Sequence, residues 1–178
     1  MTLLLIAACF FSYALELGGD GSALCAAYGL IPAHPTAGSA VTSLFLHDPA
    51  SWMHIGGNMA FLFVLGRIVE RERGSLYLGF VYFAAGLGGA LTHVLVNPAA
   101  TDPMVGASAA IFGLAPIAMM LRPRLIGFIG SMVAFNIAEL FMGSGGSVAV
   151  GAHVGGFVVG SLFVLVARAS RSDCLEAA

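Results

Sequence analysis

The sequence predicts an all-α membrane protein, a bundle of six transmembrane helices with both termini in the cytoplasm. Composition gives the class, because 59% of the 178 residues are hydrophobic and only 9% are charged. Soluble domains carry about 25% charged residues, so too few charges remain here for a surface that faces water. Six apolar segments give the number of helices, and the positions of the arginines give the orientation.

The whole chain, residues 1–178, is assigned to one transmembrane domain. Its first apolar segment, 3–17, is short for a span of roughly 20 residues. A signal peptide would explain that length, but the segment lacks a basic start and a clear cleavage site. Residues 18–53 are broken by glycine and proline, so we expect a long first loop with short helical pieces. The other spans are expected at 54–69, 76–96, 108–121, 125–142 and 148–167, with a turn at Gly143–Ser147 before the last.

All the arginines fall on one side of a six-span arrangement. They are Arg67, Arg71, Arg73, Arg122, Arg124, Arg168 and Arg171, and there is no lysine. Basic residues mark the cytoplasmic side of membrane proteins, so both termini are expected there. The net charge is −2, and because the sequence has no basic stripe no nucleic-acid partner is expected. The expected surroundings are the lipid bilayer.

Four polar side chains are expected at one shallow depth near the outer surface. His54 and Ser108 begin the second and fourth spans, and Asn58 lies one turn below His54. His153 lies about five residues into the sixth span, some ~7 Å below its outer end. Because polar groups are costly inside a membrane, they are expected to face the bundle interior or a water-filled cavity.

This cluster has the residue types of a serine hydrolase. Serine becomes a nucleophile beside a base, and His153 is the best candidate because Gly156 and Gly160 give its helix a smooth face for close approach. Phe112, one turn below Ser108, is placed to stack on the imidazole. Two alternatives stay open on these residues alone, since serine commonly caps a helix and a membrane histidine commonly makes an interhelical hydrogen bond.

Acyl transfer also needs donors for the developing oxyanion. The amide of Asn58, a ring nitrogen of His54 and the backbone N–H of Ser108 are the candidates. A metal is not expected, because asparagine is a poor zinc ligand and the sequence offers no further ligands. Cys9, Cys25 and Cys174 are too few and too widely spaced for a disulfide framework or a zinc site. No cofactor is expected.

Several motifs in order resemble the rhomboid family of intramembrane serine proteases. They are Phe45-Leu-His47, His54-x-x-x-Asn58, Gly106-Ala-Ser108 and Ala152-His153-x-x-Gly156-x-x-x-Gly160, and the resemblance covers about residues 40–165. It implies a catalytic dyad of Ser108 and His153, with His54, Asn58 and Gly106 shaping the oxyanion site. It also implies hydrolysis of peptide bonds in transmembrane substrates near the outer leaflet. Glu70 falls where relatives carry a structural glutamate, and Phe112 where they carry an aromatic that packs on the histidine.

The chain departs from the family pattern at two places. Ala109 stands where the family's usual Gly-x-Ser-Gly motif has its second glycine, and alanine still permits close packing. The Trp-Arg pair common in the first loop is absent, because residues 18–53 contain no arginine. Among the other polar residues, Asp102 is expected to be a solvated loop acid rather than a third catalytic member. Asn136 and Glu139 are candidates to line the water cavity or the substrate gate. His34, His47 and His93 are expected to be structural or exposed.

Two rival functions remain open on the sequence. One is a catalytically inactive rhomboid relative that binds membrane clients. The presence of both Ser108 and His153 argues against it. The other is a small channel or transporter. Two observations argue against it, because the polar residues gather at one depth and no inverted repeat is evident. By resemblance, the compact chain is expected in a bacterial plasma membrane with its active site toward the extracytoplasmic side. The sequence indicates neither the natural substrate nor the oligomeric state.

Overall fold

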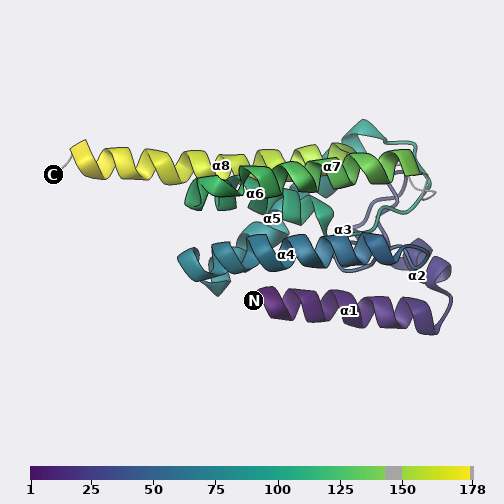
Figure 1. Ribbon diagram of the computed structural model, residues 1–178. Coiled ribbons are helices and arrows are strands. Elements are labelled where there is room, and N and C mark those ends of the chain that lie inside the picture. Colours follow the sequence, from purple (N-terminus) through teal and green to yellow (C-terminus); the bar gives the residue numbers. More distant parts are fainter. Residues whose placement is uncertain (143–149, 177–178) are drawn as a thin grey trace.

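The computed structural model describes residues 1–142 and 150–176, whose regular structure is helical apart from one isolated bridge between Leu30 and Met104. Its elements are α1 (Thr2–Gly18), α2 (Gly21–Tyr28), α3 (Ala37–Thr42), α4 (Trp52–Arg73), α5 (Ser75–Val96), α6 (Ser108–Leu121), the 3-10 turn η1 (Pro123–Leu125), α7 (Ile126–Met142) and α8 (Val150–Glu176). The long helices run side by side, and α8 extends past the others toward its C-terminal end (Figure 1). The all-α prediction is confirmed for these residues. The expected turn at Gly143–Ser147 lies outside them.

A helix occupies each of the six apolar segments, and two of these helices run further than expected. The helix α4 begins at Trp52, because the hydroxyl of Ser51 accepts a hydrogen bond from the His54 backbone N–H at 3.2 Å. It continues to Arg73 instead of ending at residue 69, and α8 continues to Glu176 instead of ending at residue 167. Both extensions contain arginine and glutamate, whose straight side chains favour the helix even outside an apolar environment.

Three of the described helices are long and apolar enough to cross a membrane. They are α4, α5 and the part of α8 that covers Val150–Ala169. The other apolar helices are shorter, among them α1 with 17 residues and α6 with 14. These lengths and the composition identify an integral membrane protein. They do not establish six spans, because a helix of 14 residues is about 21 Å long and the hydrocarbon core is about 30 Å thick.

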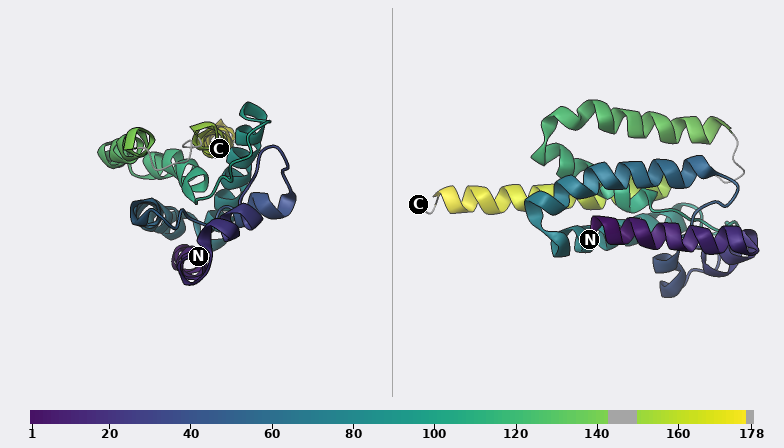
Figure 2. Two further views of the ribbon diagram at one scale, coloured as in Figure 1. Left: turned by 90° about the vertical axis from the view of Figure 1, so that its right-hand side faces the viewer. Right: turned by 60° about the horizontal axis from the view of Figure 1, so that its bottom comes forward.

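The helix α6 lies at the centre of the bundle, in contact with α4, α5 and α8. The left view of Figure 2 looks nearly along the helices and shows α7 at the edge of the bundle. Of the ten consecutive positions of α6 from Ala109 to Ala118, nine are buried and Phe112 is half-buried. A helix that is apolar on every side belongs in an interior. The burial of α6 on every side therefore agrees with its central position in the bundle.

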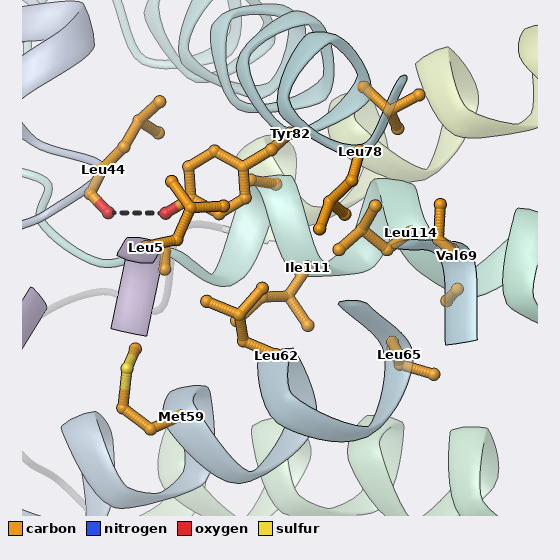
Figure 3. Packing of buried hydrophobic residues seen from close by; sticks show 14 of the residues in the cluster. Leu5, Leu44, Met59, Leu62, Leu65, Val69, Leu78, Tyr82, Ile111 and Leu114 are labelled. Atoms are coloured by element: carbon orange, nitrogen blue, oxygen red, sulfur yellow. Dashed lines mark hydrogen bonds between the residues drawn. The ribbon is translucent and has the colours of Figure 1, made fainter. Parts of the chain in front are cut away.

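The first loop packs deeply against α5. The Tyr82 hydroxyl, in a fully buried side chain, donates a hydrogen bond to the Leu44 carbonyl at 3.1 Å (Figure 3). A Cβ added at Gly86, one turn further along α5, would lie 2.7 Å from the Leu44 side chain. The loop is thus held within the apolar core that leucines from α1, α4, α5 and α6 build around it (Figure 3).

Glu70 joins three helix ends at the other end of the bundle from Ser108. Its carboxylate accepts hydrogen bonds from the Ser75 hydroxyl at 2.7 Å, the Thr2 backbone N–H at 3.2 Å and the Arg67 guanidinium at 3.3 Å. The neighbouring Gly74 connects α4 to α5 with a φ of 89°, a conformation that glycine adopts without strain. These contacts agree with the expected structural part of Glu70.

Candidate active site

The structure brings Ser108 and His153 into direct contact. The Nε2 atom of His153 lies 2.7 Å from the Ser108 Oγ, which is hydrogen-bond distance, although the residues are 45 positions apart. His153 is buried, with 8% of its surface exposed. The hydroxyl does not cap the helix, because Ala107 occupies the cap position and makes no side-chain hydrogen bond there. The capping alternative for Ser108 is therefore wrong.

Glycines set the distance between these two residues. A Cβ at Gly156 would lie 2.0 Å from the Ala109 carbonyl oxygen, and a Cβ at Gly160 would lie 1.9 Å from that of Gly113. No side chain fits at either glycine, so the backbones of α6 and α8 touch directly. The predicted smooth face on α8 is confirmed as the contact that carries His153 to Ser108.

Phe112 stacks on His153 as the sequence predicted. The two rings are parallel within 5°, with 4.5 Å between their centroids. Because Phe112 and Ser108 are four residues apart on α6, one turn of helix presents both the hydroxyl and the ring that packs on the imidazole.

Gly106 lies close to two polar side chains. Its φ of 125° requires glycine, and its backbone N–H donates to the Ser43 carbonyl at 2.8 Å. A Cβ at this position would lie 2.8 Å from His54 Nε2 and 3.8 Å from Ser108 Oγ. The absence of a side chain therefore lets the imidazole of His54 lie close to the backbone at Gly106, beside the hydroxyl of Ser108.

The hydrogen bond on the far side of the His54 ring fixes its tautomer. The Asp48 backbone N–H donates to His54 Nδ1 at 3.3 Å. A backbone N–H can only donate, so Nδ1 accepts, and the neutral imidazole carries its proton on Nε2. The ring thus presents an N–H donor toward Gly106.

Two further donors belong to the same region. The buried Asn58 amide donates one N–H to the His54 carbonyl at 2.8 Å, and its second N–H has no partner among the described residues. Ser108 is the first residue of α6, so its backbone N–H has no carbonyl to bond within the helix. These are the groups that the sequence nominated as oxyanion donors.

The remaining polar residues lie away from this cluster or outside the described side chains. Asp102 and His34 are exposed in loops. His93 is buried and contacts the Asn97 amide through Nδ1 at 3.3 Å. The side chains of Asn136 and Glu139 lie outside the described residues. Within the described part of the chain, no three His, Cys, Asp or Glu side chains are grouped to hold a metal.

His47 lies in the first loop and is fully buried. Its Nδ1 contacts the Phe45 carbonyl at 3.2 Å, and its ring lies 5.2 Å from that of His54. Burial, together with the nearby His54, lowers the pKa of His47 to about 3, against an ordinary value of 6.5. The imidazole is therefore neutral at physiological pH.

Glu16 lies near this site, and no function was predicted for it from the sequence. It is only 1% exposed, and its carboxylate accepts the His47 backbone N–H, with distances of 3.1 and 3.4 Å to the two oxygens. The available signal was a carboxylate at the end of an apolar helix, because such residues are rare and commonly functional.

The fold and this site define an α-helical membrane protein with a serine and a histidine in hydrogen-bond contact at its centre. The comparisons with known proteins give the family. The Rhomboid domain model matches residues 36–170, and the chain belongs to the rhomboid family.

Relatives from Arabidopsis thaliana support this assignment. RHOMBOID-like protein 5 is 30% identical over 139 residues, which cover 72% of this chain and 44% of the relative. RHOMBOID-like protein 1 is 33% identical over 138 residues, which cover 71% of this chain and 34% of the relative. The chloroplastic Rhomboid-like protein 11 is 39% identical over 82 residues, covering 46% and 28%. The matches thus span less than half the length of these relatives.

Proposed function

We propose that the protein is an intramembrane serine endopeptidase that hydrolyses peptide bonds in or near the transmembrane segments of other membrane proteins. The observation that carries the proposal is the 2.7 Å contact between Ser108 Oγ and His153 Nε2. A serine hydroxyl beside an imidazole nitrogen is the arrangement that activates serine as a nucleophile.

In the proposed reaction, Ser108 Oγ attacks the carbonyl carbon of the scissile bond while its proton passes to His153 Nε2. The carbon–nitrogen bond then breaks, and the leaving amine takes that proton from the imidazolium. A water molecule attacks the resulting acyl-enzyme, with His153 again as the base, and releases the acid and the free serine. Phe112 holds the imidazole plane throughout through its parallel stack.

The oxyanion is proposed to lie beside Gly106, between His54 and Ser108. The Nε2–H of His54, the backbone N–H of Ser108 and the Asn58 amide are its proposed donors. Hydrogen-bond donors fixed in advance around such a site commonly contribute the largest part of the rate enhancement. Gly106 is proposed to admit the substrate carbonyl, since any side chain there would lie against His54.

Six spans with both termini in the cytoplasm belong to this proposal, on the strength of the one-sided arginines. In that orientation Ser108 lies toward the extracytoplasmic side, below the membrane surface, because α6 is shorter than the bilayer core. Transmembrane substrates would have to unwind locally before cleavage, since a helix satisfies its own backbone amides. The predicted bacterial plasma membrane has no support from the relatives, which are plant proteins, so the proposal concerns the side of the membrane only.

Labelling of detergent-purified protein with a fluorophosphonate probe tests the activated serine. Wild type, Ser108→Ala and His153→Ala are compared with Ser131→Ala, which removes a hydroxyl bonded only to its own helix at the Phe128 carbonyl. Labelling of wild type and Ser131→Ala, lost in the other two variants, is the expected result. Labelling that survives Ser108→Ala would show that the activated serine is not Ser108.

Incubation with a synthetic transmembrane peptide in detergent then tests hydrolysis. Fragments found by mass spectrometry with wild type and absent with Ser108→Ala would support the endopeptidase. A folded wild type that binds the peptide but neither labels nor cleaves would contradict the proposal and indicate the inactive, client-binding alternative.

A further inference from the structure

Glu16 lies at the start of a short route to the proposed oxyanion site. It comes from the end of α1, and its carboxylate accepts the backbone N–H of His47. We propose that Glu16 is a positioning residue for His54, which it orients through the segment His47–Asp48. This inference rests on the proposed function, in which His54 is an oxyanion donor.

The route has two hydrogen bonds and one peptide unit. The Glu16 carboxylate fixes the N–H of His47, and the next N–H along the chain, that of Asp48, donates to His54 Nδ1 at 3.3 Å. Because consecutive amide planes share one Cα, holding the first restrains the second. The bond to Nδ1 in turn keeps the proton on Nε2, the atom that lies close to Gly106.

The surroundings of Glu16 indicate that it serves this segment specifically. A carboxylate that is 1% exposed at the end of an apolar helix is costly unless its oxygens accept hydrogen bonds. Both oxygens accept from the same backbone N–H, at 3.1 and 3.4 Å. The neighbouring Tyr13 packs edge-on against Trp52, two residues before His54, with 5.1 Å between ring centroids. The end of α1 thus holds the loop before His54 and the helix that carries it.

Kinetics with a cleavable transmembrane peptide separate positioning from general stability. Glu16→Leu removes the acceptor, and we expect kcat to fall on the order of 10-fold with KM little changed, because a misplaced donor weakens the transition state more than substrate binding. Glu16→Gln keeps an oxygen that accepts the His47 N–H, so it should recover most of kcat. Equal losses with Leu and Gln would overturn the positioning by hydrogen bond.

The same substitution in a His54→Ala background tests whether Glu16 acts through His54. If it does, Glu16→Leu should lower kcat of the His54→Ala protein less than 2-fold, because residues in one network are not additive. A 10-fold loss in both backgrounds would contradict the proposal.

Nitrogen-15 NMR of histidine-labelled protein tests the orientation without any activity, and therefore still decides if no peptide is cleaved. In wild type and Glu16→Gln, His54 should show an acceptor Nδ1 and a protonated Nε2, whereas Glu16→Leu should show both tautomers. Glu70→Leu is the matched control, because it removes another helix-borne carboxylate that accepts a backbone N–H, at the far end of α4. Altered His54 signals in Glu70→Leu, or unchanged signals in Glu16→Leu, would overturn the inference. If Glu16→Leu does not fold, Glu16→Ser takes its place, because the serine side chain is too short to reach the loop.

Discussion

The ring of Phe112 lies parallel to the imidazole of His153, within 5° and with 4.5 Å between centroids. No side-chain carboxylate among the described residues contacts this imidazole. The orientation of the proposed base therefore depends on a flat apolar surface instead of an acidic third member, and this relationship yields the first prediction.

Phe112→Leu should lower kcat on the order of 10- to 100-fold, because the imidazole loses the surface that fixes its plane and small misplacements of catalytic groups are costly. The thermal midpoint should change little, since Phe112 is only half-buried. Phe11→Leu, at an exposed position on α1, is the control and should retain wild-type kcat. Unchanged turnover in Phe112→Leu would show that the stack has no part in catalysis.

Gly160→Ala should separate α6 from α8. Its methyl group would lie 1.9 Å from the Gly113 carbonyl oxygen, a backbone atom that cannot turn aside. We expect a loss of about 1–3 kcal/mol in unfolding free energy, measured by unfolding in detergent, together with loss of fluorophosphonate labelling. Gly127→Ala places a methyl group in open space and should retain labelling. Full labelling of Gly160→Ala would mean that the helices do not touch there.

Gly106→Ala should abolish labelling more completely than its effect on stability explains. The substitution strains a backbone with φ of 125° and also places a methyl group against His54 Nε2. Gly74→Ala provides the matched comparison, because φ is 89° there but no atom lies within 4 Å of the added carbon. Each variant should lose about 1–3 kcal/mol from the backbone alone. Only Gly106→Ala should lose the label, and equal labelling of both would argue against an oxyanion site at Gly106.

Ala109→Gly should be tolerated, with labelling retained and about 1 kcal/mol or less lost, as expected for glycine within a helix. The methyl group of Ala109 faces Gly89 of α5, where an added Cβ would lie only 2.6 Å away. Gly89→Ala should therefore be destabilising. Ala109→Gly should not rescue it, because the new methyl group would still lie 2.5 Å from the Ala152 carbonyl oxygen. Full rescue in thermal unfolding would show that Ala109 is the only obstacle.

Stability should fall in acid through His47. Its pKa is lowered to about 3 in the fold, against about 6.5 in the unfolded chain. Between these values the unfolded state binds the extra proton, so unfolding free energy falls by about 1.4 kcal/mol for each pH unit below 6.5. Above pH 6.5 this contribution is complete. His47→Asn should show a shallower decline in unfolding free energy between pH 6 and 4, whereas exposed His34→Asn should follow wild type. Coincident curves for all three would contradict the burial of a neutral imidazole at position 47.

Much of the proposed site could be predicted because it depends on short-range geometry. Ser108 and Phe112 share a helix face, and the glycines near His153 indicate where another helix fits closely. Glu16 could not be connected to His54 in this way, because the link passes through an irregular loop whose path depends on packing against α5. The partner of Ala109 was equally hidden, since the sequence does not indicate which helix lies against Gly89.

The paired glycines on α8 also make function depend on helix register. A slide of one turn, about 5.4 Å, would move Gly156 and Gly160 away from the carbonyls of Ala109 and Gly113 that they contact. In such a slipped arrangement His153 would lie a full turn away from Ser108. Copies in that register would lack the contact between Ser108 and His153, so the proposed hydrolytic chemistry would arise only with the final assembly of the helices.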